Sequence, residues 1–235
     1  GQVTRQTEAT VPPAVLATAT LPPVTPTPVA PTATRVPPTA TSAPTATPTP
    51  VQVYTADFSG AAPDWNQKPD ANGRQYVQDS AYHVVVSTTT SWVTWQYPAS
   101  KPVFKDFTLE VRGRYESGPE VNGYGAIFRY VDDSNFYFLV VTANGKWGFA
   151  KRVKGSWTSL VPLTSDSAIL KGKAPNTLRV VAKGSNFTFS VNGKQVGTFT
   201  DSTHVAGTVG VFTSNDQPGN YHVVYESLRA TILLP

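Results

Sequence analysis

The chain contains no cysteine and no methionine, and only 14% of its 235 residues are charged, against about 25% in an average globular protein. Without cysteine it has no disulfide, thiolate metal site or cysteine nucleophile. No run approaches the roughly 18 apolar residues of a membrane-spanning helix. The net charge of +4 is small and dispersed along the chain, so we expect no nucleic-acid or polyanionic partner.

The composition divides the chain at residue 50. Residues 1–50 hold 12 of the 21 prolines and 14 threonines, with no aromatic residue, whereas 51–235 hold all 26 aromatic residues. Proline removes amide donors and fixes φ, so we predict an extended, polyproline-II-like N-terminal tail over 1–50. Residues 51–235 are expected to form one β-rich domain.

The Thr/Pro-rich tail is typical of an O-glycosylated stalk. Together with the missing methionine, it leads us to expect a processed, secreted or cell-surface protein. Asn186-Phe187-Thr188 is an N-glycosylation sequon, a weaker signal because such triplets often arise by chance. The candidate O-glycosylation sites are Thr18, Thr20, Thr25, Thr27, Thr32, Thr34, Thr39, Thr41, Thr45, Thr47 and Thr49.

The first half of the tail also carries apolar side chains, which could anchor it on neighbouring subunits. Docking of each tail on the next copy would propagate an open helical assembly. The anchor candidates are Val11, Val15, Leu16, Leu21, Val24 and Val29.

The domain shows the short, alternating runs of an all-β protein. Phe107–Tyr115 places Phe107, Leu109 and Val111 on one face, and Phe136–Val141 is apolar on both faces, as in a central strand. Asn144-Gly145 and Asn192-Gly193 predict tight hairpin turns of the primed type. Twelve or more strands at this spacing favour a two-sheet antiparallel jelly-roll sandwich, and the only helical candidate is a turn near 165–170.

A series of motifs runs through the domain, over about residues 55–232. They are Asp57-Phe58-Ser59, Trp65, residues 125–130 and 132–137, Trp157 with Leu160, and residues 176–180, 189–193 and 207–212. Together they resemble the concanavalin A-like and laminin G-like sandwich families. That resemblance implies a jelly-roll fold, but these families include lectins, glycan-binding modules, glycosidases and structural domains, so it does not select an activity.

No catalytic motif is present. The Glu-x-Asp-x-x-Glu strand of the glucanase branch is absent, and Glu110 is followed at i+2 by Arg112 instead of an acid, so we expect no enzymatic activity. The histidines lack ligand spacing, and we expect no cofactor or metal. Calcium is a weaker alternative, to which Asp57, Asp132 and Glu226 could contribute oxygen ligands.

Aromatic side chains are the main candidates for a binding site, because sugars stack on indole and phenol rings. Alternation puts Trp95 and Tyr97 on one face of their strand and Trp92 on the other. Trp147 and Trp157 lie on successive strands of a meander. Each of these residues has core packing as its alternative, and the basic cluster Lys151, Arg152 and Lys154 is interpreted as a solvated turn.

Two functions follow from these observations. The first is a non-enzymatic extracellular structural protein that self-assembles into a filament or surface layer through its glycosylated tail, with copies of itself as partners. The alternative is a carbohydrate-binding module on a flexible glycosylated linker, with extracellular polysaccharide as its partner.

Overall fold

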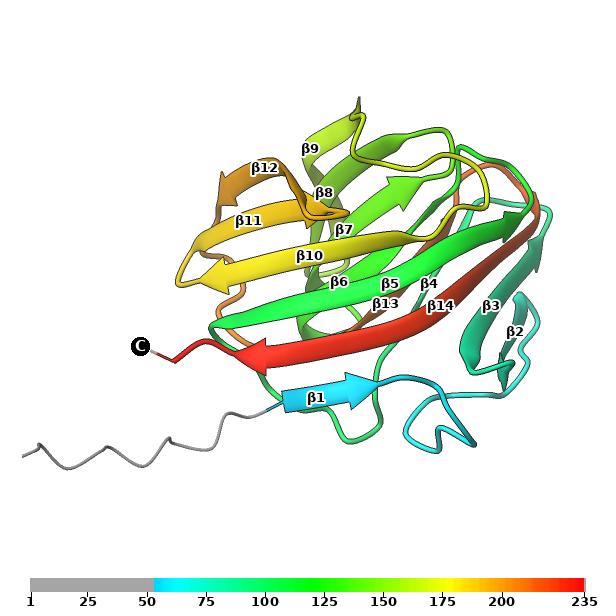
Figure 1. The fold of residues 1–235 in the computed structure, drawn as a ribbon, viewed down its shortest axis with the longest axis horizontal. Helices are drawn as coiled ribbons and strands as arrows, with labels where there is room; N and C mark the ends of the chain where they lie inside the picture. The colour runs from blue at the N-terminus through cyan, green and yellow to red at the C-terminus, as the bar shows by residue number, and fades with distance from the viewer. Residues whose placement is uncertain (1–52, 235) are drawn as a thin grey trace, which may run out of the picture. The chain divides into compact units, whose positions relative to one another are not determined.

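The computed structural model describes residues 53–234, which form fourteen strands and no helix. The strands build two antiparallel sheets packed face to face (Figure 1). The expected all-β, two-sheet sandwich is confirmed. The predicted extended tail over 1–50, with its threonines and apolar anchors, lies outside the described residues.

One sheet has eight strands, and the long strand β14 (Gly219–Ile232) runs through it. Along one side β14 pairs with β5, and along the other it pairs first with β3 and then with β1 (Val53–Ala56), as Figure 1 shows at the lower edge. The other strands, in spatial order, are β12 (Lys194–Thr200), β11 (Asn186–Val191), β10 (Asn176–Lys183), β5 (Phe107–Ser117), β14, β3 (Ala81–Thr88) and β2 (Gly73–Gln78).

The second sheet has six strands and lies behind the first in Figure 1. Its centre is the meander expected from the sequence, in which successive strands pair with short turns. In spatial order its strands are β4 (Trp92–Gln96), β13 (Thr208–Asn215), β6 (Gly123–Asp132), β7 (Asn135–Thr142), β8 (Lys146–Val153) and β9 (Ser156–Ser165).

The main hydrophobic core fills the space between the two sheets. Phe107, Leu109 and Val111 of β5 all point into it, as their alternation predicts, and are at most 1% exposed. From the six-stranded sheet, β7 contributes Tyr137 and Leu139. A second, smaller apolar cluster lies outside the core and is described below with the site.

The hairpin turns follow two different designs. Asn192 and Gly193 both have positive φ, 51° and 81°, as the predicted primed turn requires. The prediction for Asn144-Gly145 is wrong in detail. There the amide of Gly145 donates to the carbonyl of Thr142 at 3.0 Å, and only Gly145 has positive φ, which is a three-residue connection that ends in a left-handed glycine.

The helical candidate is also not a helix. Residues 166–169 form a turn in which the amide of Ile169 donates to the carbonyl of Asp166 at 3.2 Å. Two strands had no clear sequence signal, β1 because it is only four residues long and β2 because its sequence Gly-Arg-Gln-Tyr-Val-Gln is largely polar. In residues 53–234 no helix is long and apolar enough to cross a membrane.

A buried arginine ties loops of the domain together. Arg129 sits at a bulge between β6 and its neighbours with φ of 47° and is 1% exposed. Its guanidinium donates to the carbonyls of His204, Lys105 and Gly184 at 2.6–2.9 Å. A buried cation is tolerated here because most of its hydrogen-bonding groups are satisfied.

Candidate functional site

The outer face of the six-stranded sheet is unusually apolar. On β7, Tyr137, Leu139 and Val141 point into the core, so Phe136 and Phe138 point outward. This explains why the run is apolar on both faces although only one face meets the other sheet. The outward set forms the second apolar cluster, whose members are Ile127, Tyr130, Phe136, Val140 and Phe212, packed with Val93, Trp95, Tyr97 and Phe138.

Small residues in the middle of this face leave a groove of about 350 Å³. Gly123 on β6 and Gly148 and Ala150 on β8 line it, where other residue types would fill the space. A Cβ atom built at Gly123 would contact Val140 and Ser214 at 3.5–3.6 Å, which is ordinary packing distance. The groove therefore exists because these positions carry no side chain or only a methyl group.

Aromatic rings form the floor and one wall of this groove. Phe138 and Phe212 are stacked with their ring centroids 4.4 Å apart, and Trp157 of β9 meets Phe138 edge-on at 5.5 Å. Trp157 is 44% exposed, so much of its indole is available to a ligand. Exposed rings beside a concave, mostly apolar surface are what a sugar-binding site requires.

A second groove of about 650 Å³ is lined by Trp95 and Tyr97. Asp133 orients this part of the site, because one of its oxygens accepts hydrogen bonds from the Trp95 indole at 2.9 Å and the Tyr130 hydroxyl at 2.6 Å. The ring of Tyr130 in turn packs on Tyr97 with 4.4 Å between centroids. Nothing in the sequence indicates this positioning role of Asp133.

The side chain of Arg152 contacts one indole from each groove. Its guanidinium carbon lies 4.6 Å from the centroid of the Trp157 ring and 5.3 Å from that of Trp95. The interpretation of 151–154 as a solvated basic turn is therefore wrong for two of its members. Arg152 is half-buried against the rings, and Lys151 forms an ion pair of 2.6 Å with Asp201.

The structure separates the five predicted sugar-binding residues. Trp95, Tyr97 and Trp157 line the grooves. Trp147 is 5% exposed and packs in the core against Phe189, so for this residue the core alternative applies. Trp92 is 40% exposed, but it points to the other side of β4, as the alternation predicts, and lines neither groove.

The carboxylates proposed as calcium ligands do not converge. Asp57 accepts hydrogen bonds from Ser59, and Asp132 caps the turn between β6 and β7. Glu226 is paired with Arg112 at 2.6 Å. Among residues 53–234 no group of three His, Cys, Asp or Glu side chains could hold a metal ion.

Asn186, the sequon asparagine, opens β11 and is exposed, with its side-chain oxygen accepting from Thr200 at 2.9 Å. Its glycosylation stays a prediction.

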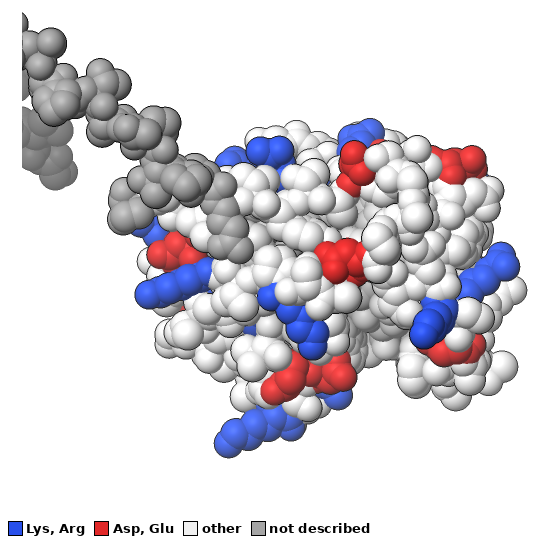
Figure 2. Space-filling view, turned by 90° about the horizontal axis from the view of Figure 1, so that it is seen from below, with Lys and Arg blue, Asp and Glu red and all other residues white. Residues whose placement is uncertain are grey.

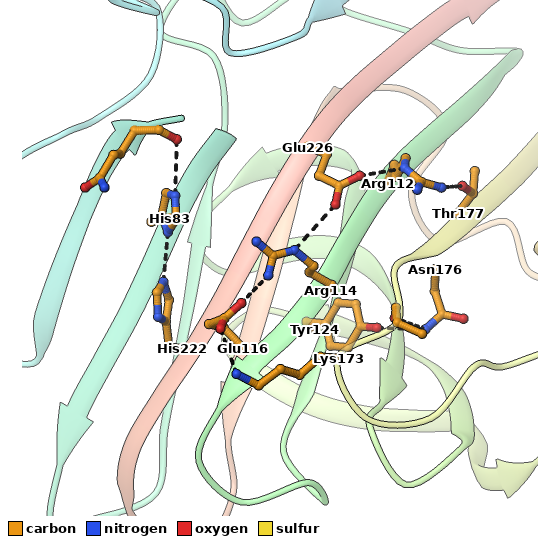
Figure 3. A network of polar contacts seen from close by, with 12 residues as sticks. His83, Arg112, Arg114, Glu116, Tyr124, Lys173, Asn176, Thr177, His222 and Glu226 are labelled. Carbon is orange, nitrogen blue, oxygen red and sulfur yellow. Dashed lines mark hydrogen bonds and ion pairs between the residues drawn. The ribbon is translucent and has the colours of Figure 1, made fainter. Parts of the chain in front are cut away.

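The opposite face of the sandwich is charged instead of aromatic. Figure 3 shows a chain of ion pairs on the outer side of the eight-stranded sheet, from Arg112 through Glu226, Arg114 and Glu116 to Lys173. Each charge in this chain has an opposite neighbour, so the network is largely self-neutralised. Figure 2 shows the side of the molecule that lies at the bottom of Figure 1. Acidic and basic side chains are interspersed there too, with no continuous basic surface among the described residues of that side.

Asp64, which lines the second groove, has a pKa shifted away from that of a general acid. Burial raises the pKa of Asp64, but hydrogen bonds from Ser100 and Tyr54 outweigh that effect and hold the pKa below its ordinary value. A proton donor in glycoside hydrolysis needs the opposite shift.

The fold is shared with solved structures of low sequence identity. The carbohydrate-binding module CBM66 from Bacillus subtilis matches with a TM-score of 0.55 and 17% identity, over 69% of this chain and 92% of that one. A protein of unknown function with a galectin-like fold from Bacillus subtilis gives 0.54 and 14%, over 75% and 94%. The GH43 protein BlXynB from Bacillus licheniformis gives 0.55 and 16%, over 75% of this chain and 38% of that one.

No family model matches the chain, and no curated protein matches it. The matches to solved structures show a jelly-roll β-sandwich fold. The resemblance found in the sequence implied this fold.

Proposed function

We propose that the protein binds carbohydrate through the aromatic grooves on the outer face of its six-stranded sheet and has no enzymatic activity of its own. The observation that carries the proposal is the exposed indole of Trp157 beside a groove floored by Phe138 and Phe212. A pyranose or furanose ring could stack on the indole while its hydroxyls reach the polar side chains at the groove edges, Thr158, Ser159 and Ser214.

The shared fold supports this function without proving it. One similar structure is a carbohydrate-binding module and another is a GH43 protein. Because identities of 14–17% carry the fold alone, the grooves of this chain carry the proposal. An extracellular location is part of the proposal, since polysaccharide is the expected partner.

The filament hypothesis rests on the tail, and the observations on the described domain favour the carbohydrate-binding alternative. The proposed absence of catalysis is supported by the low pKa of Asp64 and the missing acid motif.

A glycan microarray probed with the full-length chain tests the proposal, with Trp157→Ala as the diagnostic variant and Trp92→Ala as its matched control. Both residues are tryptophans of similar exposure, 44% and 40%, but only Trp157 lines a groove. Losing the stacking surface should weaken binding about tenfold, and the control should bind like the wild type. Equal effects of both substitutions would contradict the assigned site.

A further inference from the structure

We propose that the saccharide bound in these grooves carries an anionic group, a carboxylate or a sulfate, and that Arg152 is the residue that selects it. The inference rests on the proposed function and names the class of its ligand. Its starting point is that Arg152 contacts an indole of each groove, Trp157 in the first and Trp95 in the second. Arg152 itself lines neither groove, but the ring centroids of Trp95 and Trp157 are 6.3 Å apart, so a saccharide that contacts both indoles lies near this guanidinium.

The terminal nitrogens of Arg152 are available to a ligand. Only its Nε–H donates within the described residues, to the carbonyl of Gly155 at 3.1 Å. No carboxylate in residues 53–234 lies within ion-pair distance of the guanidinium. The two Nη atoms are not among the fully buried polar atoms without partners, so neither is completely shielded from solvent.

The bond to Gly155 and the stacked indoles hold the guanidinium plane in place. A fixed plane presents its N–H groups as a fork that matches the two oxygens of a carboxylate or sulfate. Contact with two indoles also removes part of the water around the cation, which strengthens its attraction for an anion. A neutral sugar hydroxyl gains less from such a donor.

Other cations lie around the second groove. The ammonium of Lys101 lies 5.1 Å from the ring centroid of Tyr97, and Lys68 lines the groove. Neither is in an ion pair within the described part of the chain. The carboxylates there, Asp64 and Asp133, already accept hydrogen bonds from neighbouring side chains.

These cations lie only around the two grooves, so their presence is consistent with the small net charge of +4. The sequence argues against a broad surface for polyanions. The cations Arg152, Lys68 and Lys101 are matched in number by the carboxylates Asp64, Asp133 and Asp216 that line the grooves. An anion is therefore favoured only beside the fixed guanidinium of Arg152. We therefore expect recognition of a short acidic saccharide at a defined position, not adsorption of any polyanion.

The test compares trigalacturonic acid with its trimethyl ester, which has the same backbone without the charges. Binding of both to the full-length chain is measured by isothermal titration calorimetry at low and moderate salt. The variants are Arg152→Gln, Arg152→Lys and, as a control for net charge, Lys183→Gln on the exposed end of β10 in the other sheet.

The proposal predicts that wild type and Lys183→Gln bind the acid about tenfold or more tightly than the ester. Arg152→Gln should bind acid and ester with equal affinity, and Arg152→Lys should recover only part of the preference for the acid because lysine lacks the fork. Equal binding of acid and ester by the wild type would overturn the inference and leave the proposed function standing. Binding of neither would also overturn it, and the proposed function is then judged on the neutral glycans of the microarray.

Discussion

His83 of β3 and His222 of β14 lie side by side on adjacent strands of the eight-stranded sheet, with Nδ1 of the first 2.9 Å from Nε2 of the second. Figure 3 shows the pair beside the ion-pair chain. The other nitrogen of His83 donates to the carbonyl of Gln78 at 3.2 Å, so Nδ1 accepts a hydrogen bond from His222 when both rings are neutral. Protonating both would leave two donors facing each other.

The pair predicts a loss of stability in mild acid. Burial is the largest effect and lowers the pKa of both histidines. For His83 the hydrogen bond to the Gln78 carbonyl opposes this shift, and for His222 the charge of His83 adds to it while Glu116 opposes it. With folded pKa values below the unfolded value of about 6.5, the unfolded chain binds more protons, so stability is present at pH 8 and falls as pH drops through 6.5 and below. Urea midpoints at pH 8 and pH 5 measure the loss.

The double variant His83→Gln/His222→Gln provides the comparison. Its urea midpoint should fall less between pH 8 and pH 5 than that of the wild type. Some dependence will remain, because burial also lowers the pKa of His204. A double variant with the same pH dependence as the wild type would show that the pair is not responsible.

Arg129→Ala should destabilise the domain by at least about 3 kcal/mol. The substitution removes the donor of the buried His204 carbonyl and of the part-buried carbonyls of Lys105 and Gly184, and each unsatisfied buried group costs roughly 1–3 kcal/mol. Arg229→Ala, at an exposed position of β14, is the matched control and should change stability by less than about 0.5 kcal/mol. Chemical denaturation measures both, and similar values for the two would contradict the role of Arg129.

Trp147 and Trp157 should behave in opposite ways when truncated. Trp147→Ala opens a cavity in the core and should cost about 3–5 kcal/mol of stability. Trp157→Ala removes a surface ring and should cost less than about 1 kcal/mol while weakening saccharide binding. Melting temperatures of the two variants separate these roles. A stable Trp147→Ala variant would mean that the core does not depend on this side chain.

The fold could be predicted from the sequence because the alternation of apolar and polar residues and the turn residues determine local structure. The alternation in β5 predicted the burial of Phe107, Leu109 and Val111. The pair Asn192-Gly193 predicted the primed turn that the structure contains. Trp147 and Trp157 could not be assigned in the same way, because which face of a strand meets the core depends on pairing and bulges. Register shifts occur in the β8–β9 pair on both sides of Phe149.

The site was harder to predict from the sequence, for a related reason. Its groove is made by residues that lack side chains, such as Gly123 and Gly148, and a glycine in a strand has several structural explanations. Arg152 looked like part of a solvated turn, since nothing in the sequence brings Trp95 of β4 to the hairpin that carries it. Both features depend on strands that are distant in sequence and adjacent in the sheet.

Filling the groove tests the central claim most directly. Gly123→Val adds a β-branched side chain that the strand accommodates, and its Cβ has ordinary contacts with Val140 and Ser214. The full-length wild type and this variant are run through native gels that contain xylan, dextran, levan, pectin or polygalacturonate. We predict that at least one polysaccharide retards the wild type, and that Gly123→Val migrates freely although its melting temperature is unchanged. A wild type retarded by none of them, or a variant retarded as strongly as the wild type, would contradict carbohydrate binding in this groove.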